Sequence, residues 1–289
     1  MLSFIRWISG LPLRLLQALG ALLGWLAWLG SSSYRALCRE NAQLAGLTPA
    51  QQRAAIGQAG RLVGELPWLW LGRAARPIGR WCQWQGAELI EQHLQSGQGL
   101  VLLTPHMGSF EVCAQAYAER FGDRKPVTVL YRPARQPWLR ELEETARDRP
   151  GLATAPATLA GVRQMIRALR KGGAVGLLPD QVPPEGMGVW APFFGKPAYT
   201  MTLATRLVLQ TGAPLLLMWA ERRPAGRGWV LHVSAPTEPM PTEAADDEAL
   251  QLACASFVNR EMERLIRQCP PQYLWGYQRY RTPRDTLAT

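Results

Sequence analysis

Short apolar runs alternate with longer helical patterns along the middle of this chain. A short apolar run bounded by turn signals is typical of a strand buried on both faces, and such strands are usually parallel and joined by helices. The apolar runs lie in residues 99–105, 126–131, 174–180 and 214–222, and the segments with helical spacing cover 87–97, 109–122, 136–148, 159–173, 198–212 and 242–267. This alternation predicts an α/β fold.

The end of the pattern differs from its middle. A first strand is expected at residues 80–86, and two late strands at 214–222 and 228–236 are joined through the turn-rich segment RRPAGRG. So short a connection joins antiparallel neighbours, because a parallel crossover needs about a dozen residues or more. The expected architecture is therefore a mixed, mostly parallel sheet covered by helices on both faces, with a loop leading to Gly195.

The N-terminus carries a long uncharged segment. Residues 15–34 read LLQALGALLGWLAWLGSSSY, with Arg6 and Arg14 before them and Arg35 and Arg39 after them. At ~1.5 Å per residue such a helix just crosses a hydrocarbon layer of ~30 Å. We therefore expect an N-terminal membrane-anchoring helix within residues 1–33, followed by a domain at 34–289.

Two alternatives to a membrane span remain open. Gln17 and the glycines and serines near the end weaken the span, and a helix lying in the interface fits nearly as well, anchored by Trp7, Trp25 and Trp28. A cleaved signal peptide is the third interpretation, with a poor cleavage signal. Because basic residues flank both ends, charge bias gives no orientation.

The segment up to residue 72 is expected to be helical. One helix should begin at Thr48-Pro49, with threonine as N-cap and proline at the first helical position. It ends in the very apolar stretch LPWLWLG, bracketed by Pro67 and Gly72. This stretch is either core or a second patch that dips into a membrane, and we favour the membrane patch.

Charge and cysteine content narrow the possible partners. Lysine and arginine outnumber acidic residues by 32 to 22, a net charge of +10, which favours an anionic partner such as nucleic acid, lipid headgroups or a phosphorylated substrate. The basic residues are dispersed, without a zinc finger or an RNP-type strand, so no nucleic acid is expected as a partner. The five cysteines form no C-x-x-C pair, so neither a disulfide framework nor a metal site is expected.

One histidine has a carboxylate at a spacing that suits catalysis. His106 follows the apolar run 99–105, and Glu111 lies five residues later. Within one helix this spacing would separate the side chains by ~140°, so they meet only if His106 sits on a strand-to-helix turn, with Ser109 placed to cap the helix. A carboxylate that orients an imidazole makes the ring a general base. The other interpretation is a structural turn histidine beside a solvated glutamate.

Several short motifs occur in the order known from one family. HMGSFE at 106–111 resembles the H-x4-[D/E] motif of glycerolipid-type acyltransferases, in particular the lipid A biosynthesis lauroyl and myristoyl acyltransferases of the lysophospholipid acyltransferase superfamily. The other similar segments are YRP at 131–133, ARDR at 146–149, LPDQ at 178–181, VWAPFFG at 189–195 and QYLWGYQRYRTP at 272–283. Ala146 and Val182 stand where that family usually has Gly and Asp. The resemblance spans nearly the whole chain.

This resemblance implies a membrane-bound O-acyltransferase that acts late in lipopolysaccharide biosynthesis. A fatty acyl chain would pass from an acyl carrier protein thioester to a hydroxyl of a phosphorylated lipid A precursor, without a cofactor or metal, because the thioester supplies the driving force. The protein is then expected at the bacterial inner membrane, in contact with anionic lipid, with its active site on the cytoplasmic side.

The resemblance also implies roles for particular residues. His106 and Glu111 are the expected catalytic pair, and the oxyanion is expected to be stabilised by turn N–H groups near Gly108 or by a nearby arginine. The expected substrate-binding residues, all in matching segments, are Arg132, Arg147 and Asp180. The arginines suit phosphate, and the aspartate ends a strand, where α/β sheets place ligands.

Other functions remain open beside this one. An acyltransferase of the same superfamily could act on a lysophospholipid or another glycolipid instead. From another class, the chain could be a non-catalytic membrane protein that binds lipid or nucleic acid. Phe193 and Phe194 are expected in the core rather than in an acyl channel.

Overall fold

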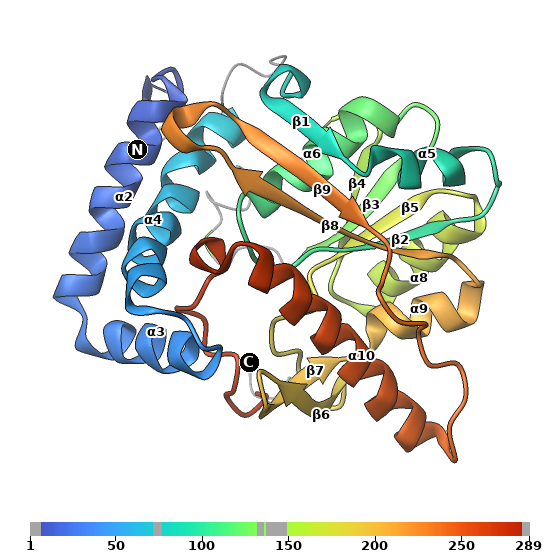
Figure 1. Cartoon of the computed structure of the whole chain (residues 1–289). Coiled ribbons are helices and arrows are strands. Elements are labelled where there is room, and N and C mark those ends of the chain that lie inside the picture. Colours follow the sequence, from blue (N-terminus) through green and yellow to red (C-terminus); the bar gives the residue numbers. More distant parts are fainter. Residues whose placement is uncertain (1–6, 72–76, 132–135, 137–148, 285–289) are drawn as a thin grey trace.

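A seven-stranded sheet forms the centre of the part of the chain that the structure describes. The structure is a computed structural model and describes residues 7–71, 77–131, 136 and 149–284. In sheet order the strands are β1 (Cys82–Gln85), β9 (Trp229–Ser234), β8 (Leu215–Arg222), β2 (Leu100–Leu103), β5 (Ala174–Leu177), β3 (Val127–Tyr131) and β4 (Leu152–Pro156). Neighbouring strands are parallel except β8 and β9, which are antiparallel (Figure 1). The predicted mixed, mostly parallel sheet is confirmed.

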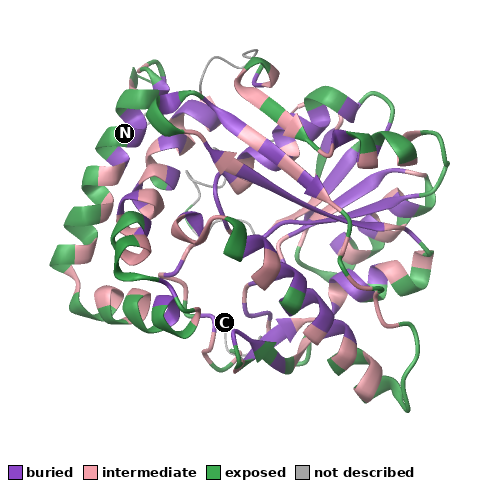
Figure 2. Cartoon of the chain, viewed as in Figure 1, coloured by how far each residue is buried: buried purple, intermediate pink, exposed green. Residues whose placement is uncertain are grey.

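Helices cover both faces of this sheet. All four residues of β2 are buried, with Leu100 and Leu102 in one apolar cluster and Val101 and Leu103 in the other. The first cluster is completed by α5 (Ala87–Leu94) and α6 (Phe110–Phe121), and the second by α8 (Leu159–Arg170), α9 (Leu203–Thr211) and α10 (Asp247–Gln268). Figure 2 shows buried strands between helices with exposed outer faces. Because both faces of the sheet are covered, its central strands appear in the sequence as unbroken apolar runs.

The N-terminal part of the described chain is helical, as predicted. It contains α2 (Leu13–Gly30), α3 (Ser32–Leu44) and α4 (Pro49–Leu71). By length and composition, α2 is apolar enough to cross a membrane. Its outer face exposes a row of leucines: Leu15, Leu19, Leu22, Leu23, Leu26 and Leu29. The expected apolar helix is therefore present and ends at Gly30, while the division into an anchor at 1–33 and a domain at 34–289 stays a prediction.

The inner face of α2 packs on α4 through glycines. A Cβ atom on Gly60 of α4 would clash with the carbonyl oxygen of Gly20 and come within 2.7 Å of the backbone nitrogen of Gly24. Gly20 and Gly24 are four residues apart in α2, and small residues at this spacing let two helix backbones approach closely. Gln17 lies on the same inner face and donates to Glu65 at 3.0 Å. The polar residue that weakens α2 as an isolated span thus has its partner in α4.

The apolar end of α4 belongs to the core. Trp68 and Leu69 are 3% and 1% exposed. The centre of the Trp68 ring lies 5.8 Å from that of Trp229 and 5.5 Å from that of Trp81. The favoured interpretation of this stretch as a second membrane patch is therefore wrong for Trp68 and Leu69, because the sheet and the η1 turn (Gly79–Trp81) cover them.

Three strands in the described ranges were not predicted. β4 lies at an edge of the main sheet. A separate antiparallel hairpin consists of β6 (Gly188–Phe193) and β7 (Lys196–Met201). Residues 198–201 belong to β7, so the helix expected at 198–212 begins later, at Leu203. These strands are only partly buried, so they lack the apolar runs that mark the central strands.

Two further expectations concern the hairpin and the segment after β3. Phe193 and Phe194 are 1% and 7% exposed and belong to the core, as predicted. The helix expected at 136–148 lies outside the described residues, except for Gln136.

Replacing Gly60 by alanine should loosen α2 from α4. The added methyl group would overlap the α2 backbone, so we expect the free energy of unfolding to fall by about 1–3 kcal/mol. Gly30→Ala is the matched control, because nothing lies within 4 Å of a Cβ atom at Gly30. Chemical unfolding in detergent, followed by circular dichroism, measures both variants. Equal stabilities would contradict close packing of the two backbones.

Candidate active site

The predicted strand-to-helix turn lies between β2 and α6. His106 comes three residues after the end of β2, and α6 begins at Phe110. Gly108 has a φ of 59°, and a Cβ atom there would clash with the carbonyl oxygen of Ala220. A residue with a side chain would be strained in this left-handed conformation and would also collide with β8. The glycine therefore lets the turn carry His106 close against the sheet.

Asp180 holds the side chain and the backbone of His106. Its Oδ1 lies 2.7 Å from Nδ1 of the imidazole, and its Oδ2 accepts from the backbone N–H of His106 at 2.8 Å. The sheet register explains this meeting. Leu103 of β2 pairs with Leu177 of the parallel strand β5, and His106 and Asp180 each follow three residues later. The His106 side chain is 16% exposed and that of Asp180 is 0% exposed, so the carboxylate supports the ring from the protein interior.

The surroundings of Asp180 keep it ionised. Its burial would raise its pKa, but the charge and hydrogen bonds of His106, together with the charge of Arg279, hold the pKa below its ordinary value. Burial, the negative charge of Asp180 and a hydrogen bond to it hold the pKa of Tyr273 well above its ordinary value. The phenol therefore stays protonated beside a carboxylate that accepts hydrogen bonds.

The carboxylate that orients the imidazole is not the predicted one. The ring nitrogen Nδ1 is paired with Asp180, whereas Oε2 of Glu111 accepts from Nε1 of Trp70 at 3.2 Å. The orienting contact expected from Glu111 therefore belongs to Asp180. The Asp180 side chain is fully buried against His106 and supports the ring, while its predicted role in substrate binding stays a prediction. A catalytic role for Glu111 stays a prediction.

His106 and Glu111 line the same cavity, whose volume is about 370 Å³. Most of its wall is apolar and comes from α6, β3, the start of α8 and the segments around β6 and β7, including Phe110, Val129, Val162, Met187, Met201 and Leu203. Gln115 also lines it, is 2% exposed, and has no hydrogen-bond partner for either amide atom within the described ranges. A mainly apolar pocket with a few convergent polar groups is typical of a ligand site.

The backbone N–H groups of the turn are already used within the protein. That of Gly108 donates to the carbonyl oxygen of Gln272 at 2.9 Å, and that of Ser109 donates to the carbonyl oxygen of Ala220 at 2.9 Å. The expectation that N–H groups near Gly108 stabilise an oxyanion is therefore wrong for these two groups. Ser109 occupies the N-cap position of α6, but its hydroxyl donates to Glu65 rather than capping the helix.

A buried ion pair is hydrogen-bonded to this turn on the side of α4 and β8. Arg222, at the end of β8, donates from Nε and Nη2 to the two carboxylate oxygens of Glu65 in α4, each at 2.9 Å. Their side chains are 2% and 0% exposed. Nη2 of Arg222 also donates to the carbonyl oxygen of Gly108 at 2.9 Å, while Glu65 accepts from Gln17 and Ser109. The pair was not predicted, and its signal in the sequence is only two opposite charges set in apolar segments.

Two predicted substrate-binding residues, Arg132 and Arg147, lie outside the described residues. Of their neighbours, Tyr131 lines the His106 cavity, and Arg149 donates to the carbonyl oxygen of Leu69 at 3.5 Å. Substrate binding by the two arginines stays a prediction. Among the described residues, no three His, Cys, Asp or Glu side chains are grouped as metal ligands would be.

Comparison with known proteins places this site in a family. The family described as bacterial lipid A biosynthesis acyltransferase matches residues 1–282. The chain belongs to this family. The predicted resemblance is therefore confirmed, and the turn with His106 and Glu111 is the part of this acyltransferase that carries the H-x4-[D/E] motif.

Individual relatives of this acyltransferase have modest sequence identity. The lipid A biosynthesis lauroyltransferase of Escherichia coli (strain K12) is 28% identical over 218 residues, which cover 75% of this chain and 66% of that protein. The lipid A biosynthesis palmitoleoyltransferase of the same strain is 24% identical over 285 residues, covering 96% and 88%. A lipid A biosynthesis acyltransferase of Haemophilus influenzae is 26% identical over 290 residues, covering 97% and 88%.

Removing one member of the buried pair should destabilise this acyltransferase strongly. In Arg222→Met the charge of Glu65 stays buried without its cation, so we expect the free energy of unfolding to fall by about 3–5 kcal/mol. Arg260→Met is the control, because Arg260 pairs with Glu238 at the surface, where the side chains are 55% and 40% exposed. For that variant we expect a loss below about 1 kcal/mol. Chemical unfolding measures both, and similar losses would show that the buried pair does not hold the turn.

Proposed function

We propose that this chain is a membrane-bound O-acyltransferase that moves a fatty acyl chain from an acyl carrier protein thioester to a hydroxyl of a lipid A precursor. One observation carries the proposal. An imidazole held by a buried carboxylate lines a mainly apolar cavity of about 370 Å³. A general base needs such an orienting partner, and an acyl chain needs such a wall.

The tautomer of the neutral His106 ring follows from its partner. Because the Asp180 carboxylate binds Nδ1, a neutral ring carries its proton on that nitrogen and keeps a lone pair on Nε2. In the proposed reaction Nε2 takes the proton of the acceptor hydroxyl as its oxygen attacks the thioester carbonyl carbon. When the tetrahedral intermediate collapses, the carbon–sulfur bond breaks and the thiolate leaves. The imidazolium returns the proton to the sulfur, and an ester and a free thiol result.

Glu111 is proposed to act as a second carboxylate of the site. It lies in the first turn of α6, five residues after His106, and lines the same cavity. In a partly desolvated site its negative charge would stabilise the imidazolium formed during proton transfer. In this scheme Asp180 orients the ring and Glu111 acts from the cavity side, so both catalytic residues expected from the sequence keep a role.

Two arginines are proposed to neutralise the negative charges of the oxyanion and of the acceptor phosphate. The N–H groups of Gly108 and Ser109 are hydrogen-bonded within the protein, so a cation is the better candidate for stabilising the oxyanion. We assign Arg147 and Arg132 to this task and to the phosphate of the acceptor, since guanidinium groups pair well with phosphate and oxyanions. Gln115, whose buried amide has no partner among the described residues, is a candidate to bind a polar group of the substrate.

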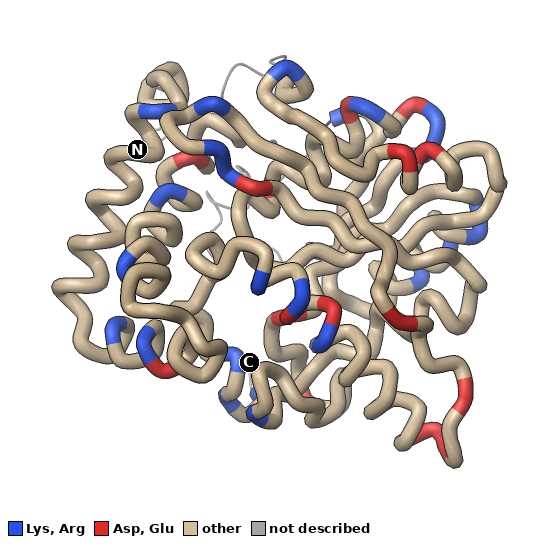
Figure 3. The backbone as a smooth tube through the Cα atoms, viewed as in Figure 1, with Lys and Arg blue, Asp and Glu red and all other residues tan. Residues whose placement is uncertain are grey.

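Two features support the proposed attachment to the inner membrane: the apolar helix α2 and the positive net charge of the protein. Figure 3 shows that α2 is without charged residues over most of its length, while lysine and arginine are spread over the other elements. The net charge of +10 suits three anionic partners: bilayer lipid, the phosphorylated acceptor and an acidic carrier protein. With an acyl carrier protein as donor, we propose that the active site lies on the cytoplasmic side.

His106→Ala tests whether the histidine carries the reaction. With purified protein, an acyl carrier protein thioester and a phosphorylated hydroxyacyl glycolipid, we expect kcat to fall by about 10²–10⁴, the usual contribution of a general base. His93→Ala on α5, outside the cavity, is the control and should retain full activity. Product is measured by mass spectrometry. Equal yields from wild type and His106→Ala would refute the enzymatic proposal, and product only from lysophospholipid or another glycolipid would refute the proposed acceptor.

Asp180→Asn tests which carboxylate orients the ring. The amide keeps the shape but removes the charge that fixes the tautomer, so we expect kcat to fall by about 10²–10⁴ with little change in KM. Glu111→Gln, made in parallel, should lower kcat less than Asp180→Asn. Thermal unfolding of both variants checks that they fold. If only Glu111→Gln loses activity, the orienting role of Asp180 is wrong.

A further inference from the structure

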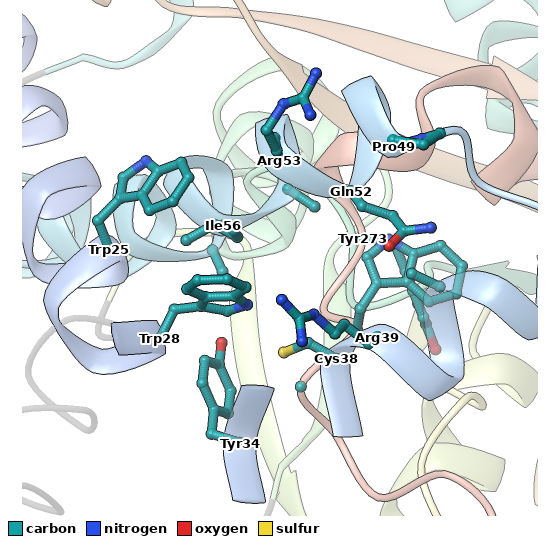
Figure 4. A pocket seen from close by; sticks show the side chains of 15 residues that line it. Trp25, Trp28, Tyr34, Cys38, Arg39, Pro49, Gln52, Arg53, Ile56 and Tyr273 are labelled. Atoms are coloured by element: carbon teal, nitrogen blue, oxygen red, sulfur yellow. The ribbon is translucent and has the colours of Figure 1, made fainter. Parts of the chain in front are cut away.

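A second cavity, separate from the His106 cavity, lies between the N-terminal helices and the C-terminal segment. Its volume is about 310 Å³, within the ~300–1,000 Å³ typical of ligand sites. Figure 4 shows it bounded by side chains of α2, α3 and α4, with Tyr273 opposite Trp25. It shares no lining residue with the His106 cavity. The proposed reaction leaves this second cavity without a ligand.

The wall of the second cavity is aromatic and aliphatic. Trp25 and Trp28 come from α2, Ile56 from α4, and Tyr273 and Trp275 from the segment after α10. The last two are 5% and 4% exposed, so the floor of the cavity is part of the protein core. Such a wall binds a hydrocarbon chain better than a polar ligand.

The charges on this cavity are all positive. Among the described residues that line it, Arg39 and Arg53 are charged and none is acidic. Both arginines are exposed, and the guanidinium carbon of Arg39 lies 5.1 Å from the centre of the Trp28 ring. Glu40, next to Arg39 in the sequence, pairs with Lys196 at 2.9 Å instead. The cavity therefore combines an apolar interior with an anion-binding edge.

The three other titratable groups on the wall, Tyr34, Cys38 and Tyr273, stay neutral. Burial and the charge of Asp180 hold the pKa of Tyr273 well above its ordinary value. Burial raises the pKa of Tyr34 to about 12, and the neighbouring thiol of Cys38 adds to this rise. Burial also raises the pKa of Cys38, although a hydrogen bond from Tyr34 acts in the opposite direction. At neutral pH no negative charge on these groups offsets Arg39 and Arg53, so the site selects an anion.

The position of the cavity indicates where its ligand comes from. The exposed leucines of α2 run from Leu15 to Leu29, and the tryptophans that line the cavity lie toward the C-terminal end of this row. Arg35, near the start of α3, caps the end of α2 by donating to the carbonyl oxygens of Trp28 and Leu29 at 2.9 and 3.1 Å. Hydrocarbon contact followed by tryptophan and arginine is the order of residues at a membrane interface.

We propose that this cavity binds one anionic phospholipid of the bilayer. An acyl chain would lie between the tryptophans of α2 and Ile56, and the phosphate would pair with Arg39 and Arg53. The proposal rests on the membrane association in the proposed function, but it requires neither acyl transfer nor His106. The ligand is a resident lipid, separate from the acceptor that reacts in the His106 cavity.

Lipid binding to the full chain in detergent micelles tests this proposal. Native mass spectrometry with dioleoyl phosphatidylglycerol should show one tightly bound molecule, and the Arg39→Gln/Arg53→Gln variant should bind it about tenfold or more weakly. Arg167→Gln/Arg170→Gln is the control, because it removes the same charge from exposed positions on α8. Equal affinity of the two double variants would overturn the site.

Further variants and probes distinguish binding of the lipid's acyl chain from binding of its phosphate. Ile56→Trp fills the apolar space, keeps both arginines and should lose the bound lipid, whereas His106→Ala should bind it like wild type even if it transfers no acyl chain. Glycerol phosphate, which lacks the chain, should not compete at matched concentration. Competition by glycerol phosphate would overturn the apolar part of the site, and stoichiometric displacement by the phosphorylated glycolipid would show an acceptor site instead.

Discussion

The buried ion pair between Glu65 and Arg222 joins the N-terminal helices to the sheet and to the turn that carries His106. It connects α4 to the end of β8. Glu65 accepts hydrogen bonds from Gln17 of α2 and from Ser109 in the turn after β2, and Arg222 donates to the carbonyl oxygen of Gly108 in the same turn. A buried pair costs desolvation energy that hydrogen bonds must offset, and here each charged group has several. The apolar helix α2 and the turn that carries His106 are consequently parts of one packed structure.

The main sheet supplies the second constraint. Because β2 and β5 are parallel neighbours, the residues just after their carboxyl ends meet, and this brings His106 to Asp180. The same edge receives the C-terminal segment, where Leu274 donates to the carbonyl oxygen of His106 at 3.1 Å. That segment continues to Trp275, whose carbonyl oxygen accepts from Asn41 of α3 at 2.8 Å. The residues around His106 are thus supported from the sheet, the N-terminal helices and the C-terminus together.

Much of this fold could be predicted from patterns that depend on neighbouring residues. Buried central strands leave unbroken apolar runs and amphipathic helices leave periodic signals, and the antiparallel pair β8–β9 was indicated by its short connection. Strands with partial burial, such as β4 and β6, leave no such signal, because what stabilises them is packing against neighbours that are distant in the sequence. The end of α4 was misjudged for a related reason: an apolar stretch with two tryptophans suits a membrane or a core equally well.

What the sequence by itself determined is the chemistry available and its place on the chain: an imidazole on a strand-to-helix turn, a glycine that the turn requires, and an uncharged helix at the N-terminus. Only the tertiary structure decided which carboxylate orients that imidazole, since Glu111 is near in sequence and Asp180 is near through strand pairing. It also decided that Glu65 and Arg222 meet, and that α2 helps to form a second cavity. Local spacing constrains residues within a few turns, whereas contacts between distant segments depend on how the whole chain packs.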